Sequence, residues 1–132
     1  EDLDRERTAV ARALGLSSLS TLEWTRRVWN ISCKTLAEAL SEDTVRDVLM
    51  PPDSVHSTAD EFVRHVLVPL NELGTVLNVS TATAARLVQA ASDKFNLPYA
   101  LEGRTLARMG LDVETAGDLA AMLGVAAPPA HM

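Results

Sequence analysis

The sequence predicts an all-α protein, a compact bundle of about seven or eight helices. Apolar residues recur at helical spacing along the whole chain, and no stretch alternates apolar and polar residues as a strand does. Glycine and proline divide this pattern into pieces of helix length. With 132 residues, 47% of them apolar, the chain can bury a core, and we expect one helical domain over residues 1–125.

The first half of the chain contains several short predicted helices. The first should cover about residues 3–14 and end at Gly15, because glycine accepts the left-handed conformation found just past a helix end. Ser18 or Ser20 is placed to cap the second helix, which contains both tryptophans. Two shorter helices should follow at about residues 34–40 and 42–50, with Ser41 as the cap between them.

The stretch PPDSVHS at residues 51–57 is predicted to be a loop. Consecutive prolines lack amide donors and keep the preceding residue out of the helical region, so a subdivision of the domain would fall here. Ser57 followed by Asp60 is typical of a helix start. Pro69 should end or kink that helix, or open the next one.

The last third of the chain contains several residues that typically mark turns and helix ends. We expect a turn at Asn96, a helix end at Gly110, a helix start at Asp112 and a helix end at Gly124. Residues 126–132, which follow the last of these, are expected to be a disordered tail or linker.

Residues 73–92, LGTVLNVSTATAARLVQAAS, are predicted to form two helices joined by a tight turn. Asn78 suits the left-handed conformation that such a turn needs, and Ser80 should cap the second helix. Gly74 is small enough for the second helix to cross closely over the first. We therefore expect leucine at this position to force the helices apart and alanine to be tolerated.

The second helix of this pair should turn Ala84, Leu87 and Val88 toward the core. The outward side then holds groups that can contact DNA, because arginine pairs with guanine or phosphate, glutamine reads adenine, and threonine can meet thymine or phosphate. The predicted DNA-contacting residues are Ser80, Thr81, Ala82, Thr83, Arg86 and Gln89.

Residues 73–88 resemble the helix-turn-helix of bacterial repressor-type DNA-binding regulators. The shared pattern runs Leu-Ala-x-x-Leu-Gly-Val-Ser-x-x-Thr-Val-x-Arg, and this sequence departs from it at Gly74, Asn78 and Ala84. The resemblance implies a DNA-binding regulatory or architectural domain that uses a helix-turn-helix at residues 69–92. An ordinary corner between two packed helices gives a similar pattern and stays open as the alternative structure.

A second, fainter resemblance covers residues 71–105, which are similar to a cyclin-type repeat of transcription factor IIB-like proteins. It depends on an apolar helix, a helix that ends in a leucine turn, and the pair Gly103 and Arg104, which would open the next helix. Gly110 makes that next helix shorter than the repeat requires.

The charge distribution separates two functional hypotheses. The net charge is −6, but residues 71–110 hold four basic and three acidic side chains and are the most basic part of the chain. This favours DNA as the partner, because phosphates are bound largely through lysine and arginine. The alternative is an acidic helical module that binds a protein partner between its helices and binds no nucleic acid. A homodimer is compatible with either hypothesis.

The sequence predicts neither an enzyme, nor a cofactor, nor a metal site. Cys33 has no second cysteine to pair with and is expected to be a buried packing residue. His56 and His65 have no partner at a metal-ligand spacing, and Asp60 and Glu61 are interpreted as charges that favour a helix start. No glycine-rich phosphate loop and no Ser-His-Asp order is present.

No apolar run approaches the roughly 18 residues that span a bilayer, and the charged start EDLDRERTAV is unlike a signal peptide. The sequence therefore predicts an intracellular protein, cytoplasmic or nuclear, with no membrane partner. The chain opens on Glu1 rather than methionine, which is typical of a segment of a longer protein.

Overall fold

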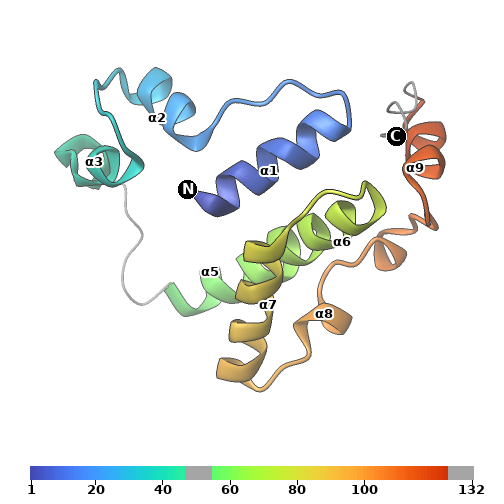
Figure 1. Ribbon diagram of the computed structural model, residues 1–132. Helices are drawn as coiled ribbons and strands as arrows, with labels where there is room; N and C mark the ends of the chain where they lie inside the picture. The colour runs from blue at the N-terminus through green and yellow to red at the C-terminus, as the bar shows by residue number, and fades with distance from the viewer. Residues whose placement is uncertain (47–54, 125–132) are drawn as a thin grey trace.

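The computed structural model describes residues 1–46 and 55–124, and every regular element in them is helical, as the sequence predicts (Figure 1). Within these residues, seven α-helices are six residues long or longer, in agreement with the predicted number. They are α1 (Asp2–Ala13), α2 (Thr21–Trp29), α3 (Leu36–Ser41), α5 (Val55–Phe62), α6 (Val68–Val76), α7 (Ala82–Phe95) and α9 (Ala116–Leu123). The shorter elements are α4 (Asp43–Arg46), the π-helix η2 (Val63–Leu67), α8 (Tyr99–Glu102) and the 3-10 helix η3 (Ala107–Met109).

Some predictions fall on residues that the structure does not describe. Most of the predicted loop at 51–57 lies outside the described residues, and so does the whole predicted tail at 126–132. The single domain over residues 1–125 stays a prediction.

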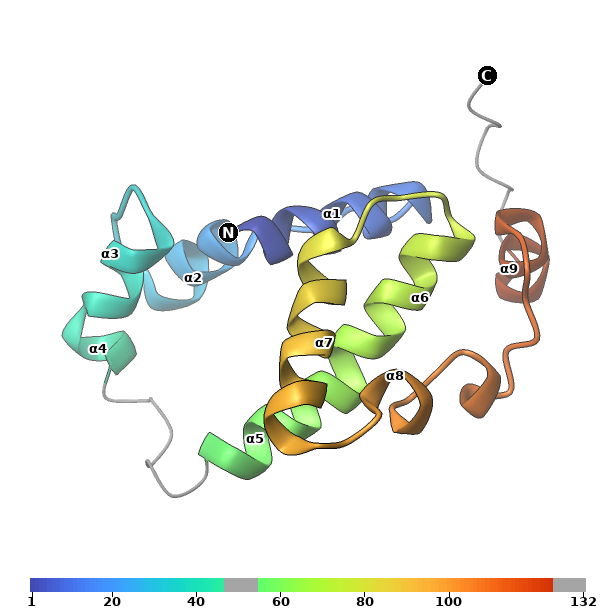
Figure 2. The ribbon, with the colours of Figure 1, turned by 60° about the horizontal axis from the view of Figure 1, so that its bottom comes forward.

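The core forms where α1, η2, α6 and α7 meet. Figure 2 shows α1, α6 and α7 side by side, with α2 to α4 at one end of the molecule and α9 at the other. The buried residues of this core include Val10 of α1, Leu67 of η2, Leu70 of α6 and Val88 of α7. Tyr99 of α8 completes it and is only 1% exposed.

Most helix ends lie where the capping and turn residues of the sequence predict them. Ser20 caps α2 through a reciprocal capping box with Glu23. Left-handed residues follow the ends of α1, α7 and α9, namely Gly15 (φ 74°), Asn96 (φ 52°) and Gly124 (φ 66°). These ends are local properties of the sequence, since each needs only one residue of suitable backbone freedom or one side-chain oxygen.

The predicted boundaries of α3, α5 and α9 are wrong, and so is the predicted Ser80 cap of α7, whose N-cap is Thr81. Ser41 is the last residue of α3 rather than a cap, α5 already begins at Val55 so that Ser57 lies inside it, and the cap of α9 is Thr115 rather than Asp112. Each interval offers more than one side chain able to cap, and which of them reaches a free backbone N–H depends on how the helix is held.

The helix that runs from α5 into α6 widens into a π-turn at η2. Pro69 lies in the first turn of α6, as one of the predicted alternatives requires, and its missing N–H removes one helical hydrogen bond. Just before it, the Val68 N–H donates to the carbonyl of Val63, one residue further back than in an α-helix. The carbonyl of Arg64 thereby loses its usual helical donor, and it accepts a hydrogen bond from the N–H of Arg104 at 2.8 Å.

The predicted corner between α6 and α7 is present, with Asn78 in the left-handed conformation at φ 54°. Gly74 is buried against the turn. A Cβ atom added there would lie 2.5 Å from Cγ2 of Thr81 and 2.9 Å from the carbonyl oxygen of Val79. The prediction that alanine is tolerated at position 74 is therefore wrong, because the turn backbone would have to move to admit even one methyl group.

Gly74→Ala should consequently lower the free energy of unfolding by about 1–3 kcal/mol, as overpacking does. Gly117→Ala is the matched control, because a Cβ atom added to this helical glycine would lie 3.6 Å from Oγ1 of Thr115, which is ordinary contact. The control should gain stability, by up to about 1 kcal/mol, because alanine favours helix. Denaturant melts of both variants measure the difference, and equal stabilities would show that the corner is looser than described.

Candidate functional site

The first turn of α7, where DNA contacts were predicted, is capped by a carboxylate from α1. Glu6 accepts hydrogen bonds from the backbone N–H of Thr83 at 2.6 Å and of Ala84 at 2.9 Å. The N-cap residue Thr81 makes no side-chain cap of its own, and the predicted cap Ser80 lies one residue before it. Glu6 therefore satisfies backbone donors that a helix start leaves unpaired.

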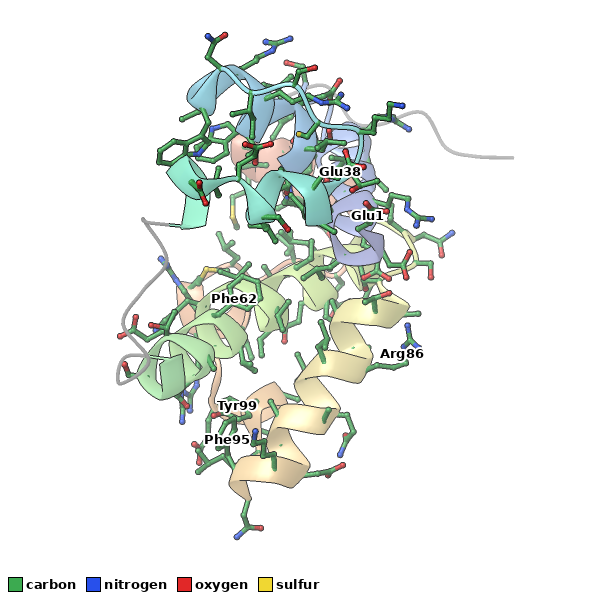
Figure 3. The ribbon with its side chains drawn as sticks, turned by 90° about the vertical axis from the view of Figure 1, so that its left-hand side faces the viewer. Glu1, Glu38, Phe62, Arg86, Phe95 and Tyr99 are labelled. Carbon is green, nitrogen blue, oxygen red and sulfur yellow. The ribbon has the colours of Figure 1, made fainter. Side chains whose placement is uncertain are left out.

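The predicted DNA-contacting residues do not form one accessible face. Thr81 is buried, and its hydroxyl donates to Oδ1 of Asn71 at 3.0 Å. Thr83 is half-buried beneath Glu6. Ser80, Ala82, Arg86 and Gln89 are exposed, and Figure 3 shows Arg86 extending away from the helices.

The prediction of which α7 side chains face the core is only partly correct. Ala84 and Val88 are buried as expected, whereas Leu87 is 42% exposed.

The electrostatics of this helix start oppose phosphate binding. Partial burial favours a raised pKa for Glu6, but the hydrogen bonds from Thr83 and Ala84 outweigh it and hold the pKa below its ordinary value. Glu6 is therefore ionised at neutral pH. A phosphate would have to displace this carboxylate from the donors and approach like charge.

A second polar cluster lies at η2, where Asp60, Arg64, Tyr99 and Glu102 meet. The Tyr99 hydroxyl donates to Oδ1 of Asp60 at 2.5 Å, and Nε of Arg64 donates to both oxygens of the same carboxylate, at 3.0 and 2.9 Å. The Arg64 guanidinium lies 4.9 Å from the centre of the Tyr99 ring, and its Nη1 is 3.6 Å from Glu102. Asp60 lies near the end of α5 rather than in its first turn, so the prediction of a helix-start charge is wrong. Its carboxylate instead connects α5 to Arg64 of η2 and Tyr99 of α8.

These contacts shift two pKa values. Burial, and then the hydrogen bond to Asp60, raise the pKa of the Tyr99 hydroxyl. The hydrogen bond to Asp60 raises the pKa of Arg64. Tyr99 therefore stays neutral and Arg64 stays charged, so the cluster holds α8 against η2 throughout the neutral range.

An apolar pocket of about 270 Å³ opens on the opposite side of the same helix. We call it the apolar pocket. Figure 3 shows Phe62 on the side of α5 that faces α3, with Tyr99 on the other side. The apolar side chains that line the pocket are Leu3, Leu36, Phe62, Val66 and Leu70.

The described residues contain no group of histidine, cysteine and carboxylate side chains that could hold a metal ion. None of the helices in residues 1–46 and 55–124 has the length and apolar character needed to cross a membrane. Cys33 is buried, as the sequence predicts.

A family model described as the α-helical domain of NAD/NADP octopine/nopaline dehydrogenase matches residues 1–95. The chain belongs to this family. The matched segment contains α1, η2, α6 and α7, so the family domain includes most of the core and both the Glu6 cap and the walls of the apolar pocket.

Two curated relatives agree with the family match. The chain is 32% identical to an opine dehydrogenase of Arthrobacter sp. (strain 1C) over 120 residues, which are 90% of this chain and 33% of the relative. It is 27% identical to the protein ocs of Agrobacterium tumefaciens (strain Ach5) over 111 residues, 83% of this chain and 31% of the relative. The chain thus spans about a third of the length of these relatives.

The family membership overturns the functional predictions. The resemblance of residues 73–88 to a helix-turn-helix regulator and that of residues 71–105 to a cyclin repeat are both wrong, and so is DNA as the partner. The alternative of a protein-interaction module is not supported, and the prediction that the chain has no enzymatic role conflicts with a family of dehydrogenases. The sequence pattern indicates two helices packed around a glycine, with a left-handed asparagine in the turn between them. This geometry also occurs in proteins that do not bind DNA.

Sequence reasoning missed the residues that organise both sites. Glu6 is 77 positions from Thr83, and nothing local in α1 points to α7. The pair of Asp60 and Arg64 has the i, i+4 spacing of a helical ion pair, a signal that could have been read. Tyr99 could not have been connected to that pair without the fold.

The Glu6 cap should make stability depend on pH. Because the folded pKa of Glu6 lies below the unfolded value of about 4.3, its contribution is present above that value and is lost as pH falls through the folded pKa. We expect Glu6→Gln to cost about 1 kcal/mol at neutral pH and progressively less in acid. Melts from about pH 7 to pH 3 measure this, with Glu61→Gln, an exposed glutamate of α5, as the control. A deficit that does not change with pH would show that Glu6 does not cap α7.

The Tyr99 hydroxyl should stabilise the fold through Asp60. Tyr99→Phe should lower the free energy of unfolding by about 0.5–1.5 kcal/mol, the usual net value of a hydrogen bond. The same substitution in an Asp60→Ala background should cost less, since the acceptor is already gone. Equal costs in the two backgrounds, measured by denaturant melts, would mean that this hydrogen bond contributes nothing.

Proposed function

We propose that this chain is the helical, substrate-side part of an NAD- or NADP-dependent opine dehydrogenase. The observation that carries the proposal is the match of the family domain to residues 1–95, the segment that builds most of the core. The 32% identity to the opine dehydrogenase over 90% of the chain supports it. A nicotinamide cofactor accepts or supplies the hydride in a dehydrogenase, and the protein positions the substrate against it.

The described residues do not fit a dinucleotide. A dinucleotide site is built from a strand, a glycine-rich turn and a helix. Residues 1–46 and 55–124 form no strand, and no two of the six glycines stand two positions apart as the GxGxxG fingerprint requires. In this proposal the nicotinamide cofactor is bound by another part of the enzyme, and this chain contributes to the substrate side.

The test is dehydrogenase activity of the full-length protein that contains this chain. Octopine, nopaline and analogues with other amino-acid side chains are each supplied with NAD⁺ or NADP⁺, and formation of the reduced nicotinamide is followed by absorbance. We expect reduction that requires both an opine and the nucleotide. Failure of the whole panel with both nucleotides would reject the proposal.

A further inference from the structure

The π-turn at η2 offers one backbone carbonyl to two alternative donors. The N–H of Val68 donates to the carbonyl of Val63, and the carbonyl of Arg64 accepts from the N–H of Arg104 at 2.8 Å. In an α-helix, the N–H of Val68 would donate to the Arg64 carbonyl instead. The two arrangements exchange one backbone hydrogen bond for another, so hydrogen bonding by itself favours neither of them strongly.

Residues 103–106, which we call the docked segment, fit closely against the π-turn and α6. Gly103 is buried, and a Cβ atom added to it would lie 2.7 Å from Cγ2 of Val68. Leu106 is also buried, and its N–H donates to Oε2 of Glu72 at 2.5 Å. Docking therefore requires a residue without a side chain at position 103, because a methyl group there would overlap with α6.

The two helices that meet at the π-turn are held to different degrees. Val68, Leu70 and Gly74 of α6 are buried. None of residues 57–62 in α5 is buried. A change of helical register at η2 would therefore move α5 and leave α6 in place, because the close-packed core fixes the buried residues of α6.

A return of η2 to the α-helical register would rotate α5 about its axis. A π-turn spans one residue more than an α-turn, and one residue corresponds to about 100° of rotation. Asp60 would leave the Tyr99 hydroxyl, and Phe62 would leave the wall of the apolar pocket. Phe62 and Tyr99 lie on opposite sides of α5 (Figure 3), so a single rotation ends both contacts.

We propose that η2 is a two-state conformational switch, in which docking of residues 103–106 keeps the π-turn and thereby holds the apolar pocket in its observed shape. In the undocked state the Val68 N–H donates to the Arg64 carbonyl, α5 rotates and Phe62 leaves the pocket. A molecule that fills the pocket therefore strengthens docking, and by linkage docking strengthens its binding by the same factor. The inference does not depend on the proposed function.

Gly103→Ala tests the switch in the full-length protein that contains this chain. The added methyl group should undock the segment, because it overlaps with the start of α6. We expect the amides of Arg104 and Leu106 to exchange with solvent about tenfold faster or more, since each loses its hydrogen bond. The fluorine NMR signal of a fluorophenylalanine at position 62, assigned with Phe62→Leu, should move to a new position in the same variant.

Two outcomes of this experiment overturn the inference. Faster exchange at Arg104 with an unchanged Phe62 signal would show that docking is ordinary packing with no link to α5. Unchanged exchange would show that docking does not depend on the close approach at Gly103. Gly117→Ala in α9 is the matched control, because its added Cβ meets only ordinary contact, and it should change neither measurement.

Deletion of His65 separates the two parts of the switch. This exposed residue lies inside the π-turn, so its removal should leave a continuous α-helix with α5 and α6 in their present orientations. The carbonyl that held the docked segment then accepts from its own helix. The segment should exchange about tenfold faster, whereas the Phe62 signal stays in place. His65→Ala, which keeps the number of residues, should change neither. Full protection of the Arg104 amide in the deletion variant overturns the inference.

Arg104→Pro keeps the inference testable if circular dichroism shows that the deletion variant does not fold. Proline removes the N–H that donates to the π-turn. Gly103 already has the extended backbone, φ −66° and ψ −178°, that suits a residue before proline. We expect faster exchange at the Leu106 amide together with a moved Phe62 signal, as in Gly103→Ala. A Phe62 signal that stays in place overturns the inference.

Discussion

The π-turn at η2 is the constraint on which much of this structure depends. It leaves the carbonyl of Arg64 without its helical hydrogen-bond donor, and this carbonyl accepts a hydrogen bond from the N–H of Arg104 instead. The same turn places Asp60 and Arg64 on the side of Tyr99 and leaves Phe62 and Val66 beside α3. One local change of helical pitch therefore joins the C-terminal segment to the core and shapes a pocket on the opposite side.

The second organising interaction is electrostatic. Glu6 of α1 supplies the negative charge that the start of α7 favours, and it does so from within the same chain. A helix start capped in this way holds two helices of the same chain together and is not free to bind a ligand. This is why a sequence with nearly every feature of a DNA-reading corner can belong to a dehydrogenase family.

The two sides of the helix from α5 to α6 differ in their chemistry. The side toward Tyr99 is closed, since its charges are paired with one another and its aromatic ring is buried. The side toward α3 is open and apolar.

The sequence by itself determined the helical class, the number of longer helices and most helix ends, because these depend on apolar spacing and on single residues such as Ser20, Asn78 and Gly124. It also showed the close corner at Gly74, but not that the corner excludes even an alanine. Only the tertiary structure decided that Glu6 covers the start of α7, that Tyr99 reaches Asp60, and that five apolar side chains from five elements enclose one pocket. These are contacts between residues distant in the chain, and residue spacing records only neighbours along a helix.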